Sequence, residues 1–211
     1  MLSIFENQFI SLGSDERKSY FYDKREQFNK LKVEDKSSLE LAALFIFLNK
    51  TCFNGLYRVN QKGLFNVPAG SYKNPTICDR VNLKNISLAL KNVEIVAGDY
   101  KKSYDFIDEK TFVYLDPPYR PLNSTSTFTS YTENGFDDEA QRQLARYFDK
   151  LNSKGAKLIL SNSDPKNCDE EDNFFDDLYK EHNIKRIEAT RMINSKAEGR
   201  GKINEILVTN F

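Results

Sequence analysis

An aspartate, two prolines and a tyrosine directly follow an apolar run in the middle of the chain. The run, Thr111 to Leu115, predicts a buried strand, and the tetrapeptide is Asp116-Pro117-Pro118-Tyr119. Two prolines keep the backbone out of a strand ladder, so carbonyl oxygens can point outward. Asp116 adds an acceptor and Tyr119 a flat ring, which are the features that an exocyclic amine on a flat base requires. Taken alone, the tetrapeptide is equally compatible with a rigid turn.

Charge is segregated along a chain whose net charge is zero, with 31 basic and 31 acidic side chains among 211 residues. Residues 50–84 hold six basic side chains and one acidic one, whereas residues 164–181 hold eight acids and two lysines. Zero net charge argues against a histone-like coating of nucleic acid. An enzyme that acts on DNA remains compatible with this composition, because DNA binding depends on where the charges lie and not on their sum. The basic block is the candidate partner surface, and we interpret the acidic one as a solvated face.

Cysteine, histidine and hydropathy patterns exclude several classes of protein. Cys52, Cys78 and Cys168 are odd in number and far apart, which argues against a disulfide framework or a zinc site. With His182 as the single histidine, a Ser-His-Asp hydrolase is improbable and no metal site is expected. The longest apolar run, residues 41–48, is too short to span a bilayer, and no signal peptide is evident. We expect a reduced, cytoplasmic protein that does not enter membranes.

The first third of the chain predicts helices followed by a hairpin. Asp15 can cap a helix that runs to about Lys32, and Ser37 or Ser38 can cap a second one. Glycines then appear, and two short apolar segments flank residues 60–63, a pattern typical of a hairpin with a glycine near its turn.

From residue 81 onward, helical and strand patterns alternate. Helices are expected at 81–90, 137–154 and 173–182, with Gly155 ending the second, and strands at 93–97, 111–115, 157–160, 184–189 and 203–209. Alternation of this kind predicts a largely parallel sheet with helices on both faces. Ligands of such sheets bind outside the carboxyl ends of strands, where Asp99, Asp116 and Ser161 are expected.

The tetrapeptide and five further segments resemble those of a known family. The tetrapeptide resembles the catalytic signature of amino-methyltransferases that modify adenine N6 or cytosine N4 in DNA with S-adenosylmethionine. Further segments resemble the Dam-like adenine methylases, which act at GATC: residues 53–60 (FNGLYRVN), 65–68 (FNVP), 72–75 (YKNP), 128–132 (FTSYT) and 200–210 (RGKINEILVTN). The resemblance covers nearly the whole chain and implies an α/β, Rossmann-like S-adenosylmethionine-dependent methyltransferase fold. Residues 1–85 would form an inserted helical and hairpin target-recognition region, and residues 86–211 the carboxyl-terminal part of the catalytic domain.

The resemblance also implies roles for the tetrapeptide and for a turn before it. Asp116 and the Pro117 carbonyl would accept hydrogen bonds from the target amine, Pro118 would shape the turn, and Tyr119 would stack on the extruded base. Asp99 and Tyr100, together with Asp116, would border the cofactor. The plainer interpretation of Asp99 and Tyr100 is a helix cap and a core aromatic.

DNA contacts are implied for the hairpin and for the loop after the tetrapeptide. Arg prefers guanine in the major groove, and Asn can serve bases, so Arg58 and Asn60 are base-reading candidates, with phosphate contact or a solvated tip as the alternative. Many family members have Arg at the position that Ser71 occupies. The full set expected at DNA is Arg58, Asn60, Lys62, Pro68, Ser71, Lys73, Thr129 and Ser130.

One departure from the family concerns the cofactor loop. Members begin with a strand that ends in a Gly-rich turn, then a strand that ends in an acid for the cofactor ribose, and neither pattern occurs in these 211 residues. The sole Gly-x-Gly, residues 199–201, precedes a strand instead of opening a helix. We therefore expect an amino-terminally truncated fold with unpaired strand edges. The alternatives are a non-catalytic DNA-binding remnant, a subunit that needs a separate amino-terminal methyltransferase chain, and a cytosine-N4 methylase.

Overall fold

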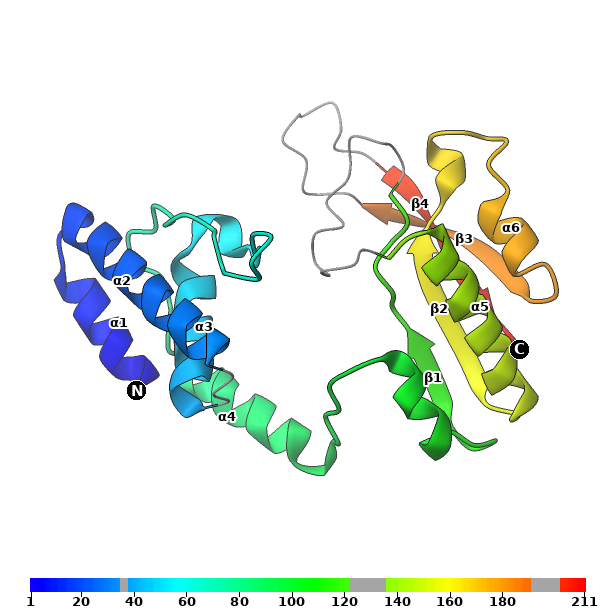
Figure 1. Ribbon diagram of the computed structural model, residues 1–211, viewed down its shortest axis with the longest axis horizontal. Coiled ribbons are helices and arrows are strands. Elements are labelled where there is room, and N and C mark those ends of the chain that lie inside the picture. Colours follow the sequence, from blue (N-terminus) through cyan, green and yellow to red (C-terminus); the bar gives the residue numbers. More distant parts are fainter. Residues whose placement is uncertain (35–37, 122–135, 191–201) are drawn as a thin grey trace. The chain divides into compact units, whose positions relative to one another are not determined.

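The computed structural model describes residues 1–34, 38–121, 136–190 and 202–211 (Figure 1). These residues divide into two compact units, Met1–Val96 and Ala97–Phe211. Each unit has its own hydrophobic core, so each is described by itself.

The first unit is built on helices whose starts follow from local sequence. It contains α1 (Leu2–Ser11), α2 (Ser14–Val33), α3 (Leu39–Thr51), α4 (Arg80–Ala89) and the short turns η1 (Phe53–Gly55) and η2 (Leu90–Asn92). The Ser38 hydroxyl accepts the Leu41 N–H at 3.1 Å, which confirms the cap predicted for α3. The expected Asp15 cap of α2 is wrong: Gly13 is the cap residue, and Glu16 accepts its N–H at 2.9 Å.

Aromatic side chains make up much of the first core. Phe47 is fully buried, and its ring meets those of Phe5, Phe9 and Tyr20 edge to face at 5.6–6.0 Å between centroids. Such geometry adds to the gain from area burial alone. The core therefore ties α1 and α2 to α3, which compensates for a modest aliphatic content.

The second unit is built on a four-stranded sheet. The strands are β1 (Phe112–Leu115), β2 (Lys157–Ser163), β3 (Asn183–Thr190) and β4 (Lys202–Thr209), in the order β1-β2-β4-β3. The helices are η3 (Tyr100–Phe106), α5 (Asp138–Ser153), η4 (Pro165–Asn167) and α6 (Phe174–Leu178). Asp137 caps α5 by accepting the Ala140 N–H at 2.8 Å, and Gly155 takes φ +83° just past its end, as predicted.

One face of this sheet carries the second core. Leu158, Leu160, Ile206 and Val208 are fully buried and pack in one cluster with side chains of α5 and α6. On the opposite face, Phe112 and Tyr114 of β1 stay exposed. Within the described residues, β1 pairs with β2 alone and so forms an edge of the sheet.

Four expectations about residues 86–211 are wrong. The sheet is mixed rather than largely parallel: β1 and β2 are parallel, but β4 runs antiparallel to both β2 and β3, because a direct return between adjacent strands needs no crossover helix. Residues 93–97 form no strand and leave Val93, Ile95 and Val96 exposed, since strand structure requires a pairing neighbour. The helix expected over 173–182 is limited to α6, and β2 runs on through Ser163.

The hairpin predicted around residues 60–63 is a turn whose flanking segments share few backbone hydrogen bonds. Val59 and Phe65 form an isolated antiparallel bridge, and Asn60 N–H donates to the Leu64 carbonyl at 2.9 Å. Gly63 takes φ +71°, a conformation that glycine adopts without strain. The predicted reversal at residues 60–63 is confirmed, although the flanking segments are not regular strands.

No helix in the described part of the chain has the length and apolar character needed to cross a membrane. Among the same residues, no cluster of three or more His, Cys, Asp or Glu side chains is arranged to hold a metal ion.

Candidate active site and DNA-binding surface

Asp116 lies where β1 ends, and β2 supplies its hydrogen-bond partner. The Ser161 hydroxyl donates to Oδ1 of Asp116 at 3.1 Å and also pairs with the Tyr114 hydroxyl at 2.9 Å. Ser161 is buried, whereas Asp116 is exposed. The Ser161 hydroxyl of β2 thus fixes one oxygen of the Asp116 carboxylate, and the exposed carboxylate remains accessible to a substrate.

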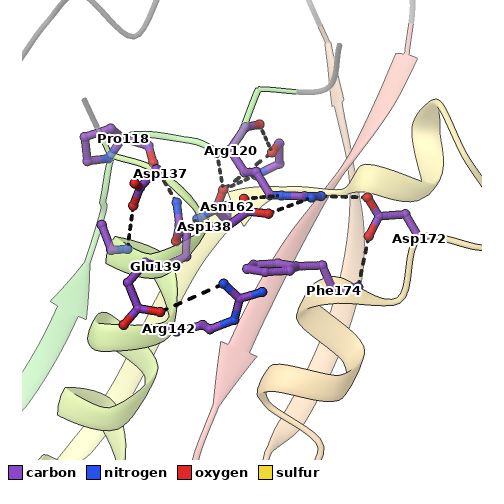
Figure 2. Close-up of polar contacts among 12 residues, drawn as sticks. Pro118, Arg120, Asp137, Asp138, Glu139, Arg142, Asn162, Asp172 and Phe174 are labelled. Carbon is purple, nitrogen blue, oxygen red and sulfur yellow. Dashed lines mark hydrogen bonds and ion pairs between the residues drawn. The ribbon is translucent and has the colours of Figure 1, made fainter. Parts of the chain in front are cut away.

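Buried amides hold the backbone of the tetrapeptide. The Gln141 amide nitrogen donates to the Pro118 carbonyl at 3.0 Å, and Asn162 in turn donates to the Gln141 amide oxygen at 3.1 Å (Figure 2). Both amides are fully buried, at 0% exposure. Because buried polar groups are costly unless paired, this network fixes the turn. At least one of the two lone pairs of the Pro118 carbonyl is thus taken up by this network.

Tyr119 combines a partly accessible ring with a held hydroxyl. Its side chain is 36% exposed, and its hydroxyl donates to Oε2 of Glu205 on β4 at 3.3 Å. Burial chiefly raises the pKa of the phenol, the Ser161 hydroxyl opposes this, and the carboxylates of Glu205 and Asp116 raise it further. The ring therefore stays neutral near pH 7 and keeps a face available for stacking.

Asp99 and Tyr100 take up local roles. Asp99 caps η3 by accepting the Lys101 N–H at 2.9 Å. The Tyr100 ring packs edge to face on Tyr147 of α5, with 5.1 Å between centroids, and burial raises the pKa of its phenol. These are the contacts of a helix cap and a core aromatic, the plainer of the two interpretations.

The residues expected at a cofactor fit a methyl donor of the S-adenosylmethionine type in part. Asp99 and Asp116 are exposed carboxylates, and Tyr100 is half-buried, so they can offer acceptors and a ring edge. Close approach of backbone to a ligand calls for glycine. Gly98, at φ +135°, is the one described glycine adjacent to them in sequence.

In the first unit, the candidate base-reading arginine is fixed across the hairpin. Nε of Arg58 donates to Oδ1 of Asn66 at 2.9 Å, and Asn66 N–H donates back to the Arg58 carbonyl at 3.1 Å. The Asn60 side chain behaves differently. Its Oδ1 accepts the N–H groups of Lys62 and Leu64, so it stabilises the turn itself.

One face of α2 anchors this hairpin, a feature that the sequence pattern did not indicate. Asn29 pairs with the backbone of Phe65 in both directions, donating to its carbonyl at 3.1 Å and accepting its N–H at 2.8 Å. Arg25 donates to the Val67 carbonyl at 3.3 Å, and Lys32 to the Gly63 carbonyl at 2.7 Å. The three side chains follow helical spacing, so they share one face of α2. This spacing of polar residues was the only feature of the sequence that could have indicated that α2 anchors the hairpin.

The remaining DNA candidates are surface residues or fall outside the description. Pro68, Ser71 and Lys73 are exposed, and the carbonyls of Pro68 and Lys73 accept hydrogen bonds from Phe53 and Arg17. Thr129 and Ser130, expected at the DNA backbone, lie outside the described residues.

Comparison with known proteins defines the class to which this chain belongs. Residues 3–193 match the family described as D12 class N6 adenine-specific DNA methyltransferase. The chain is 51% identical over 211 residues to the type II methyltransferase M.MjaIII of Methanocaldococcus jannaschii, covering 100% of this chain and 71% of that protein. It is 44% identical over 196 residues to the type II methyltransferase M1.LlaDCHI of Lactococcus lactis, covering 92% of this chain and 66% of that protein.

A third relative is the DNA adenine methylase of Vibrio cholerae, 33% identical over 192 residues, with 90% of this chain and 65% of that protein covered. The chain thus belongs to the D12 class N6 adenine-specific DNA methyltransferase family. It spans about two thirds of the length of these relatives. The comparisons give no support to a separate amino-terminal methyltransferase chain as a partner.

Proposed function

We propose that this chain forms part of a DNA methyltransferase that transfers a methyl group from S-adenosylmethionine to N6 of an adenine flipped out of duplex DNA. The observation that carries the proposal is the position of Asp116. It is an exposed carboxylate at the end of β1, with one oxygen fixed by Ser161, and it is followed directly by the rigid Pro117-Pro118 backbone. Family membership supports DNA adenine as the substrate.

In this proposal, Asp116 and the Pro117 carbonyl accept hydrogen bonds from the adenine amine. These bonds strengthen as the nitrogen lone pair leaves the ring plane, so they act mainly in the transition state. Tyr119 offers its ring face to the flipped base. S-adenosylmethionine supplies the electrophilic methyl group, and Asp99, Tyr100 and Asp116 would lie at one side of its site. The sheet of the second unit would be part of a Rossmann-like methyltransferase fold.

The hairpin of the first unit would read the target sequence, within a recognition region of residues 1–85. Arg58, held by Asn66, presents a guanidinium group suited to guanine. Lys62 and Lys73 add positive charge for the phosphates, and Ser71 and Pro68 shape the adjoining surface. We propose a GATC-type site, read from double-stranded DNA.

The test is methyl transfer from labelled S-adenosylmethionine to duplexes that contain or lack GATC, followed by nucleoside analysis. We expect N6-methyladenine, with little product from a duplex in which GATC is altered. N4-methylcytosine as product would overturn the assignment of the base. Sequence-specific DNA binding with no transfer by the full-length protein would instead favour the non-catalytic DNA-binding reading.

A further inference from the structure

Arg120, the residue after the tetrapeptide, is the centre of an ion-pair cluster (Figure 2). Its Nε and Nη2 donate to the two carboxylate oxygens of Asp138 at 2.7 and 3.1 Å, and its Nη1 donates to Asp172 at 2.6 Å. The guanidinium carbon lies 4.4 Å from the centroid of the Phe174 ring. All three nitrogens of the side chain are therefore engaged, and its plane rests on an aromatic ring.

The main chain of Arg120 is held as well. Its N–H donates to Oδ1 of Asn162 at 3.0 Å, and its carbonyl accepts the Ser163 hydroxyl at 2.7 Å. Asn162 and Ser163 are the last residues of β2 and are buried. One residue thus joins the end of the tetrapeptide to β2, to the first turn of α5 and to the segment before α6.

Arg120 and Asp172 are partly shielded from solvent, with side-chain exposures of 21% and 27%, whereas the Asp138 side chain is 44% exposed. Burial tends to raise the pKa of Asp172, but hydrogen bonds from Arg120 and from the Phe174 N–H outweigh it and lower that pKa. A bidentate Arg–carboxylate pair adds geometric specificity to its energy. This geometry suits a side chain that holds neighbouring segments of the chain in a fixed arrangement.

Arg120 and Asp138 also flank one stretch of chain. Arg120 comes just before residues 121–137 and Asp138 just after them, so their ion pair joins the two ends of that stretch. The same arginine therefore sets both the end of the tetrapeptide and the place where the chain returns to α5.

We propose that Arg120 is a positioning residue for methyl transfer, which holds Asp116–Tyr119 in the reactive arrangement through Asp138, Asp172 and the end of β2. The inference rests on the proposed function, because it assigns Arg120 to the same reaction. Arg120 acts through these neighbours and not by contact with the reacting atoms. Its effect arises because a catalytic group displaced by about 1 Å can lose about 10²-fold in rate.

The test compares Arg120→Gln with the matched control Arg142→Gln in the full-length protein. Arg142 lies against the same ring, 5.2 Å from the Phe174 centroid, but its ion pair is with the exposed Glu139 at 4.0 Å, away from the tetrapeptide. For Arg120→Gln, we expect the single-turnover rate of adenine methylation to fall about 10²-fold while DNA affinity is retained. Arg142→Gln should change the rate by no more than about threefold, as is usual for an exposed side chain.

A double-mutant cycle with Asp138→Asn separates positioning from a general loss of stability. Asp138→Asn should lower the rate by a smaller factor, and the double variant should be no slower than Arg120→Gln, because both changes break one pair. Additive losses would overturn the proposal, as would an Arg120→Gln enzyme that keeps the wild-type rate. If Arg120→Gln does not fold, Arg120→Lys takes its place, since lysine keeps the charge but cannot form the bidentate pair.

A second readout does not depend on activity. Amide hydrogen exchange of the peptide spanning 114–121 should accelerate in the Arg120 variant and not in Arg142→Gln, because the former releases the turn. Unchanged exchange would overturn the inference even in a protein that methylates DNA. Absence of N6-methyladenine from the wild-type reaction would instead count against the proposed function, and the exchange comparison would still decide the role of Arg120.

Discussion

The Asp116 carboxylate, just past the end of β1, and the Ser161 hydroxyl, within the adjacent parallel strand β2, are joined by a 3.1 Å hydrogen bond. The bond fixes one oxygen of an exposed carboxylate without burying the group. A carboxylate that must accept from an incoming amine needs such a combination of fixed direction and open access.

Asp116→Ala should abolish methyl transfer while leaving the fold intact, because the lost acceptor acts chiefly in the transition state. Ser161→Ala removes only the bond that orients Asp116, so we expect a loss of about 1 kcal/mol, or roughly fivefold in rate. Single-turnover methylation and circular dichroism check both variants. Near wild-type methylation by Asp116→Ala would refute the assignment of Asp116.

Arg58→Ala should weaken discrimination between the cognate duplex and one with a replaced guanine by about 1–3 kcal/mol, if the contact is bidentate. Lys62→Ala is the matched control at the exposed tip of the same hairpin. It should lower affinity equally for all duplexes and reduce the salt dependence, as the loss of a phosphate contact does. Binding measured by fluorescence anisotropy at two salt concentrations tests this, and a uniform loss for Arg58→Ala would make Arg58 a phosphate contact.

Asn29→Ala should lower the free energy of unfolding by about 1–3 kcal/mol, because it leaves the N–H and carbonyl of the buried Phe65 without their partners. Glu26→Ala, on the exposed side of α2, should stay within about 0.5 kcal/mol of the wild type. Urea unfolding provides both values. Equal stabilities of the two variants would show that Asn29 does not anchor the hairpin.

The lowered pKa of Asp176 predicts that the stability of the fold depends on pH. Burial acts to raise its pKa, but the hydrogen bonds from Arg186 at 2.7 and 3.0 Å and the ion pair with Lys166 at 3.3 Å outweigh burial and lower it. A pKa that is lower in the folded state stabilises the fold above the unfolded value of about 3.9, and this stability is lost as pH falls through the folded pKa.

Asp176→Asn should therefore be less stable than the wild type near pH 6, and the difference should shrink as pH falls toward about 2. Asp177→Asn, at the next and exposed position of α6, is the control and should follow the wild-type curve. Thermal unfolding across this pH range is the measurement. Parallel curves for Asp176→Asn and the wild type would contradict the predicted linkage.

The sequence by itself determined the features that depend on near neighbours. The Ser38 cap, the start of α5 at Asp137 and its end before Gly155 follow from signals within one helical turn. The tetrapeptide at Asp116 directly after a strand, and the reversal at residues 60–63, were predictable for the same reason. In each case the residues that decide the structure are a few positions apart.

Tertiary structure alone decided which distant residues hold the candidate site. Asn29 and Phe65 are 36 positions apart, and Arg120 and Asp172 are 52 apart, so no local pattern indicates that they meet. Residues 93–97 give the converse case: an apolar β-branched segment that forms no strand, because a strand is stable only when a neighbour pairs with it. Local sequence sets the propensity of a segment, but the partner that satisfies its backbone and side chains is chosen by packing of the whole chain.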